Sequence, residues 1–183
     1  MKNILLIALL LGSVSLFAQN QNPKESGKFD IRFGVGVSIL GTGDYVTLNI
    51  ENELNYKINR YFAAATSLQF GRSSKDDSFG YFSTISFVQG NLNLFISPFT
   101  NVNNNDFRIG SGFSVYNISE AEIPKEGAIS YAYNRRTSFG FNIIVEDTYR
   151  ISKRFLLGAK LFSQPYTNGD INTGILLKFG YIL

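Results

Sequence analysis

The sequence predicts an all-β protein, a closed antiparallel up-and-down transmembrane β-barrel of eight strands. An early stretch carries apolar residues at every second position from Phe29 to Ile39, preceded by Lys28 and with Asp30 and Arg32 among the residues between them. Such alternation gives a strand with two different faces. The same period returns in segments of about 9–13 residues, the length that a tilted strand needs to cross a bilayer. The 17 Phe, 10 Tyr and 17 Gly suit strands with interfacial aromatic residues and tight turns.

The beginning of the chain reads as a secretory signal peptide over residues 1–18. Lys2 supplies the positive start, Ile4 to Leu11 the apolar run, and smaller residues lead to a cleavage site after Ala18. The apolar run is too short to span a membrane, and a retained amphipathic anchor is the alternative. Residues 19–27 form a short polar lead-in, and residues 28–183 form one outer-membrane β-barrel domain.

The first three strands are expected over residues 28–39, 45–57 and 61–72. A turn at Gly41 to Asp44 joins the first two, because its glycines supply the positive φ of a tight hairpin. In the second strand, apolar residues from Val46 to Tyr56 share one face, and only Asn52 interrupts it. The third strand has a thinner apolar face that ends at Phe70.

In the fourth segment, residues 79–98, the apolar residues change from odd-numbered to even-numbered positions partway along. Its apolar residues are odd-numbered up to Phe87 and even-numbered from Leu92 onward. A β-bulge near Gln89 and Gly90 would restore the facing, and a hairpin at this point is the alternative. We favour the bulge, because it preserves the even strand number typical of bacterial single-chain barrels.

The remaining strands are expected over residues 107–117, 137–150, 155–164 and 171–183, and the first, second and last of these carry apolar residues at alternate positions. The intervening segment 118–136 has mixed charge and no sustained period, so it is expected to be the longest loop. A tight turn at Ser152 to Arg154 precedes the seventh strand.

An internal similarity relates residues 56–62 (YKINRYF) to residues 149–155 (YRISKRF), 93 positions later. Both copies are expected to be tight turns at one end of the barrel, with loops of varied length at the other. Outer-membrane barrels have this asymmetry, with short turns facing the periplasm. Aromatic residues at strand ends are expected to form two girdles, with Tyr116 in the outer one.

A soluble barrel of the lipocalin type would show the same alternation with its apolar face inside. We favour the membrane orientation, because the apolar face persists in every segment and the other face is bulky and charged. The chain resembles the small eight-stranded outer-membrane barrels of the OmpX/OmpA/OmpW-like kind. The most specific element is the terminal strand from Ile175 to Leu183, similar to the strand by which such barrels are recognised for insertion, although it ends in Leu rather than an aromatic residue. The resemblance implies a place in the bacterial outer membrane, with lipid, lipopolysaccharide and the barrel-insertion machinery as partners.

The inward face carries charges of both signs from most of the strands. These residues are Asp30, Arg32, Glu51, Glu53, Arg108, Glu146, Arg150, Lys160 and Lys178. Side chains fill an eight-stranded barrel, and a lone buried charge costs several kcal/mol, so the charges need partners. We expect Glu51 or Glu53 to pair with Arg32, and Glu146 to pair with Arg150 or Lys160, giving a polar plug.

The chain has no histidine and no cysteine, which excludes serine–histidine hydrolysis, cysteine nucleophiles and histidine metal sites. We therefore expect no enzyme activity, metal or cofactor, and the small net charge of +3 gives no reason to expect nucleic-acid binding. The expected function is a structural or cell-surface interaction role through the outer loops, with Tyr131, Tyr133, Arg135 and Arg136 as candidates for contact with an extracellular partner. The alternative is a narrow channel or passive transporter for small solutes or small hydrophobic molecules.

Overall fold

The computed structural model describes residues 28–41, 45–76, 81–98, 104–124 and 132–183. The strands are β1 (Phe29–Gly41), β2 (Tyr45–Lys57), β3 (Phe62–Asp76), β4 (Tyr81–Ile96), β5 (Asn105–Pro124), β6 (Ala132–Arg150), β7 (Phe155–Pro165) and β8 (Ile171–Ile182). The segments expected to hold the signal peptide and the polar lead-in lie outside the described residues.

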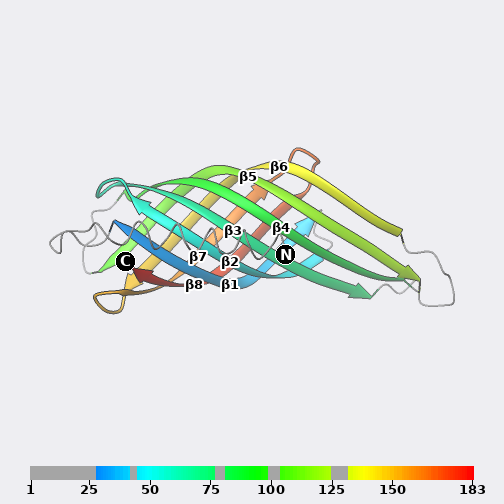
Figure 1. Ribbon diagram of the computed structural model, residues 1–183, viewed down its shortest axis with the longest axis horizontal. Coiled ribbons are helices and arrows are strands. Elements are labelled where there is room, and N and C mark those ends of the chain that lie inside the picture. Colours follow the sequence, from blue (N-terminus) through cyan, green and yellow to red (C-terminus); the bar gives the residue numbers. More distant parts are fainter. Residues whose placement is uncertain (1–27, 42–44, 77–80, 99–103, 125–131) are drawn as a thin grey trace, which may run out of the picture.

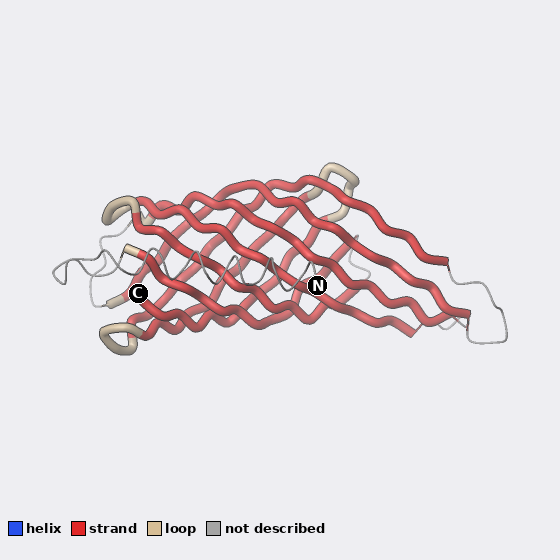
Figure 2. The backbone as a smooth tube through the Cα atoms, viewed as in Figure 1, coloured by secondary structure: helices blue, strands red, loops and turns tan. Residues whose placement is uncertain are grey.

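The eight strands form one closed barrel in sequence order, and every neighbouring pair is antiparallel. Closure is completed by β1 and β8, which pair from Asp30 with Ile182 to Gly41 with Ile171. The predicted fold class and strand number are confirmed (Figures 1 and 2). Because the ladder closes on itself, the strands leave no unpaired sheet edge over the height that all of them share.

The two ends of the barrel differ. The short connections at residues 58–61 and 151–154, the longer connection between β4 and β5 at residues 97–104, the start of β1 and the end of β8 lie at one end, which we call the turn end. The connections after β1, β3, β5 and β7 lie at the other, the loop end. In Figure 1 the turn end is at the left, beside the label of the C-terminus.

The outer surface is apolar and the interior is polar. Outward side chains such as Val46, Phe113 and Phe139 are 67%, 72% and 64% exposed, whereas Arg32, Glu51 and Arg108 are each 1% exposed inside. A barrel in water would bury its apolar face, so this arrangement is that of a membrane-spanning barrel. No helix in the described part of the chain is long and apolar enough to span a membrane.

The bulge expected near Gln89 and Gly90 is wrong. β4 is one strand and keeps an unbroken register with β3, from Phe62 opposite Ile96 to Asp76 opposite Phe82. Its register with β5 is equally continuous. The parity of the apolar residues changes because the lumen itself becomes apolar at this height: Ile85 and Phe87 point inward and are 2% and 3% exposed.

The loop expected over residues 118–136 is also wrong in its extent. β5 continues to Pro124 and β6 begins at Ala132, and the two strands pair out to Glu122 opposite Ala132. β5 and β6 contain 20 and 19 residues, against 11 and 12 for β7 and β8. The wall made by β3 to β6 therefore rises above the rest of the barrel at the loop end (Figure 1).

Of the aromatic residues expected at strand ends, four at the turn end point outward: Tyr56, Phe62, Tyr149 and Phe155 are 39–57% exposed. Tyr116, expected in the outer girdle, instead lies inside the lumen and is 0% exposed. Its even-numbered position on β5 is on the same face as Arg108 and Ser114, both of which are buried.

Candidate functional site

The inward residues of β2 show how the lumen is layered. Alternation places Thr47, Asn49, Glu51, Glu53 and Asn55 one after another on the inner wall, and each is at most 1% exposed. Charged residues occupy the half toward the turn end, and amide and hydroxyl groups follow toward the loop end. Together the layers make the lumen a packed interior, as expected for a barrel of eight strands.

Two glutamates of β2 and two lysines form one part of the charged layer. Lys160 Nζ lies 2.7 Å from Glu51 Oε1 and 3.0 Å from Glu53 Oε2. Lys178 Nζ lies 2.7 Å from Glu51 Oε2 and 3.1 Å from Glu53 Oε2. Since the lysines come from β7 and β8, these contacts tie distant sides of the barrel together.

Two arginines complete the charged layer. Arg108 of β5 contacts Glu53 at 2.9 Å and Glu146 at 3.0 Å, and its Nη1 donates to Asn55 at 2.7 Å. Arg32 of β1 pairs with Asp30 and with Glu146. The Arg108 guanidinium also stacks on Phe95, 3.9 Å from the ring centroid.

The charged layer is electrically neutral. Its cations are Arg32, Arg108, Lys160 and Lys178, and its anions are Asp30, Glu51, Glu53 and Glu146, all buried. Every one of them has an opposite charge within 3.1 Å. Such pairing offsets much of the desolvation cost of eight buried charges.

The pairs differ in part from those expected. Arg32 contacts Asp30 and Glu146 rather than Glu51 or Glu53, and Glu146 contacts the two arginines rather than Arg150 or Lys160. Glu146 and Lys160 are opposite each other in the register of β6 and β7, yet Lys160 reaches across to β2. Arg150 lies outside the layer, half-buried at the turn end.

Above the charged layer, amides and hydroxyls bridge the lumen. Asn142 donates to Asn93 Oδ1 at 2.7 Å, and Gln69 donates to Asn49 at 3.1 Å. Tyr166 is the residue after β7, and its hydroxyl donates a hydrogen bond to Gln89.

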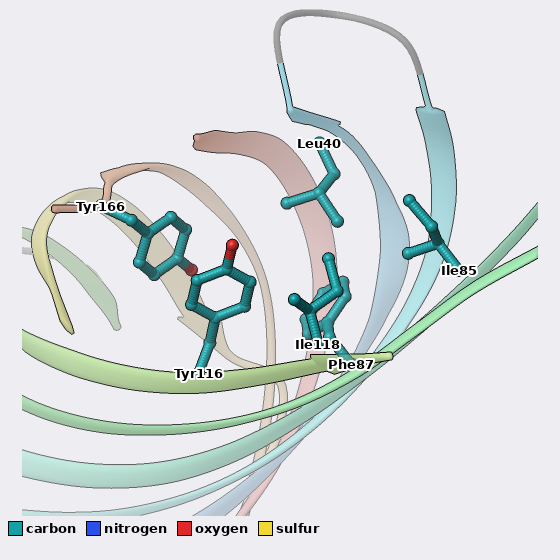
Figure 3. Packing of buried hydrophobic residues seen from close by; sticks show 6 residues of the cluster. All are labelled: Leu40, Ile85, Phe87, Tyr116, Ile118 and Tyr166. Carbon is teal, nitrogen blue, oxygen red and sulfur yellow. The ribbon is translucent and has the colours of Figure 1, made fainter. Parts of the chain in front are cut away.

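An apolar cluster closes the lumen nearer the loop end (Figure 3). Its members come from β1, β4, β5 and the β7–β8 connection: Leu40, Ile85, Phe87, Tyr116, Ile118 and Tyr166. The rings of Tyr116 and Tyr166 face each other, with their centroids 4.1 Å apart. This cluster is not among the features expected from the sequence, although the parity change in β4 indicates that apolar side chains enter the lumen there.

A glycine makes room for one member of the cluster. A Cβ atom at Gly71 would lie 2.1 Å from Cε1 of Phe87, so only glycine lets this inward ring pack against β3. Gly110 does the same for Phe95 deeper in the lumen, where a Cβ would lie 2.5 Å from the ring.

A small cavity of about 100 Å³ lies at the loop end. It is lined by Leu40, Gly41, Tyr45, Ile85 and Ile118 and by the charged residues Glu120, Arg136 and Asp170. Arg136 lies 2.9 Å from Glu120 and 3.2 Å from Asp170, and Asp170 also accepts a hydrogen bond from Tyr116. Arg135 is exposed on β6 and donates to Asn117 at 2.7 Å. Of the other candidates for contact, Tyr133 is on β6 and Tyr131 lies outside the described residues.

The described residues contain no group of three or more His, Cys, Asp or Glu side chains arranged to hold a metal ion. The carboxylates of Glu51 and Glu53 form ion pairs with lysines, and those of Asp30 and Glu146 form ion pairs with arginines. The arrangement therefore neutralises charge and fills space.

No protein-family model matches the sequence, and no curated protein matches it. Solved structures do match in fold. Ail, the attachment invasion locus protein of Yersinia pestis, aligns with a TM-score of 0.62 and 10% identity, covering 86% of this chain and 99% of Ail. Neisserial surface protein A aligns with a TM-score of 0.61 and 10% identity, covering 87% of this chain and 100% of that protein.

A major outer membrane protein from Thermus thermophilus aligns with a TM-score of 0.60 and 12% identity, covering 86% of this chain and 99% of that protein. All three identities are low, so the likeness concerns the fold. With its apolar outer wall and charged interior, this chain has the fold of the small eight-stranded outer-membrane β-barrels.

Proposed function

We propose that this protein is a non-enzymatic barrel of the Gram-negative outer membrane, closed to solutes, that acts through its loop end in a structural or cell-surface interaction role. The observation that carries the proposal is the neutral charged layer, in which four buried cations and four buried anions pair within the lumen. A pathway for solutes would instead favour a continuous polar track with room for water.

Two layers of different chemistry support closure. Ion pairs hold Glu51 and Glu53 against side chains from other sides of the barrel, and the apolar cluster fills the lumen nearer the loop end. An ion that passed the charged layer would next have to shed its water among apolar side chains. The layers therefore oppose passage in different ways.

The raised wall supports a role at the loop end. β5 pairs with β6 along the full height of this wall, whereas β7 pairs with β6 only from Ile143 onward, with one further bridge at Gly140. Residues 132–137 of β6 thus have no strand partner on the β7 side among the described residues. A sheet edge of this kind can accept an added strand from another protein, and the exposed Arg135 beside it offers a cationic contact.

Membrane lipid, lipopolysaccharide and the barrel-insertion machinery are the partners expected of a barrel in the outer membrane. The outward apolar side chains would face membrane lipid, and the loop end would face outside, where lipopolysaccharide lies. The alternating strand β8, which completes the barrel, is the element we propose for recognition by the insertion machinery. The chain has no histidine or cysteine, and its lumen carboxylates are paired with cations. It therefore offers few groups for acid–base or nucleophilic catalysis.

The first test measures passage through the folded barrel. The chain without residues 1–18 is refolded into liposomes, folding is verified by heat-dependent gel mobility, and influx of solutes of graded size is recorded beside an open porin. We expect no influx through the wild-type barrel. A triple variant with Glu51→Ala, Lys160→Ala and Ile118→Ala removes side chains from both the charged layer and the apolar cluster, and it should admit small solutes. Size-limited influx through the wild type would instead establish the channel alternative.

The second test concerns the raised wall. Ser119 and Arg135 are register partners, so residues 120–134 can be replaced by a short Gly/Asn turn without shifting the pairing below. Bacteria that display the trimmed and full barrels at equal density are compared for adhesion to matrix-coated surfaces and for autoaggregation. Equal adhesion and aggregation by both would remove the surface-interaction role.

A further inference from the structure

The internal repeat places two cations at the turn end. Lys57 is the last residue of β2, and Arg150, its counterpart in the second copy, is the last residue of β6. In a closed ring of eight strands, β2 and β6 are four strands apart, so these two residues start from opposite walls. Both are half-buried.

Backbone hydrogen bonds fix where the two side chains begin. The N–H of Lys57 donates to the carbonyl of Lys28 at 2.8 Å, and the N–H of Arg150 donates to the carbonyl of Asn104 at 2.8 Å. Asn104 holds the left-handed conformation, with φ of 64°. The strand ends that carry the cations are therefore part of the hydrogen-bonded wall.

Both cations line one cavity of about 150 Å³, together with Asn104, Asp106, Thr148 and Leu156. Within the described residues, neither the Lys57 nor the Arg150 side chain has an ion pair or hydrogen bond, in contrast to the four paired cations of the charged layer. Asp106 brings one negative charge to the lining and accepts a hydrogen bond from Ser97 at 3.0 Å. The lining thus carries an excess of positive charge.

We propose that this cavity binds a compact oxyanion, a phosphate or carboxylate group. The Arg150 guanidinium can bind such a group through two parallel N–H donors, and Lys57 supplies a second charge from the opposite wall. Asn104 adds an amide as a neutral donor. Thr148 also lines the cavity, but its hydroxyl donates to the backbone carbonyl of Asp106 at 3.5 Å. The volume is several times the roughly 30 Å³ that one water occupies in the liquid, which leaves space for a phosphate-sized group.

The site is separate from the loop end, so it does not depend on the surface role proposed above. Two sources could deliver the oxyanion: a dissolved anion entering through the turn end, or the phosphate of an anionic lipid in the surrounding leaflet. The wall of strands separates the cavity from the lipid, which favours the dissolved anion.

The test is calorimetric titration of the folded barrel in octyl glucoside, a phosphate-free detergent, with inorganic phosphate and with acetate. We expect saturable binding, weakened about tenfold or more in Lys57→Gln and Arg150→Gln, because each variant removes a charged hydrogen-bond donor. Lys153→Gln is the matched control: it makes the same charge change at the same end, on an exposed turn residue outside the cavity. Asp106→Asn should tighten binding.

Folding of each variant is checked by heat-dependent gel mobility, and Arg150→Lys provides a milder variant that keeps the charge and loses the planar donor pair. Absence of saturable binding to either anion would overturn the site. Equal weakening by Lys153→Gln would reduce it to general attraction by a positive barrel end. Inorganic phosphate could also bind in octyl glucoside but not in phosphatidylglycerol nanodiscs. That result would mean that a lipid headgroup occupies the cavity, and it would overturn the proposal that a dissolved anion binds there.

Discussion

Lys160 on β7 contacts Glu51 on β2 inside the barrel, with its Nζ atom 2.7 Å and 3.0 Å from the two carboxylate oxygens. Both side chains are buried, and β8 and β1 lie between their strands in the ring. The contact therefore links walls that share no backbone hydrogen bonds, and it makes the lumen contents part of what holds the barrel together.

Removing one partner of this contact should destabilise the barrel more than removing both. Glu51→Gln leaves a positive excess in a neutral layer and should lower the free energy of unfolding by about 3–5 kcal/mol. Lys160→Gln should cost a similar amount, and the double variant should cost less than either single change because the layer is neutral again. Urea titration of the barrel in lipid vesicles measures all three. Strictly additive costs would mean that the ion pair contributes nothing.

Glycine at position 71 should be required by Phe87. In Gly71→Ala the new Cβ would lie 2.3 Å from Cζ of Phe87, so we expect a loss of about 1–3 kcal/mol from overpacking. Gly90→Ala is the control, because a Cβ there meets nothing within 4 Å. Phe87→Leu should restore part of the loss in the Gly71→Ala background. Equal stability of the two alanine variants, measured in the same titrations, would contradict this packing.

A charge on the outer wall should be costly only where lipid surrounds it. Leu177 lies in the middle of β8 and is 56% exposed, and Leu177→Arg should cost about 2–4 kcal/mol when the barrel folds into a bilayer. Ile151 is 61% exposed in a turn at the end of the barrel, and Ile151→Arg should cost little. Folding yield and urea stability in vesicles separate the two. If Leu177→Arg were tolerated as well as Ile151→Arg, the outer face would not contact the hydrocarbon.

Opening the apolar cluster alone should leave the barrel closed. Ile118 is 1% exposed, and Ile118→Ala should lower the free energy of unfolding by about 2–5 kcal/mol because it leaves a cavity. Solute influx should remain absent, since the charged layer still fills the lumen. Ile109→Ala on the outward face of the same strand, where the side chain is 48% exposed, is the control for stability. Influx in Ile118→Ala would show that the cluster by itself forms the barrier.

The faces of the strands were predictable because side-chain direction in a strand depends only on parity. Asp30, Arg32, Glu51 and Lys178 could be placed inward from their own segments, before any neighbour was known. Ile85 and Phe87 are the exception: they are apolar but face the lumen, so the bulge expected from the change in parity does not exist. Apolar content marks the outer face only where the lumen is polar.

The sequence by itself therefore determined the all-β class, the eight strands, the apolar outer wall and most of the charges of the lumen, because each follows from a local period of two. Only the tertiary structure decided that Arg32 meets Glu146, that Lys160 crosses to Glu51, and that an apolar cluster closes the lumen above them. These contacts join residues that are far apart in the chain or that come from several strands at once. They depend on how the strands are staggered when the barrel closes, and no single segment of the chain encodes that stagger.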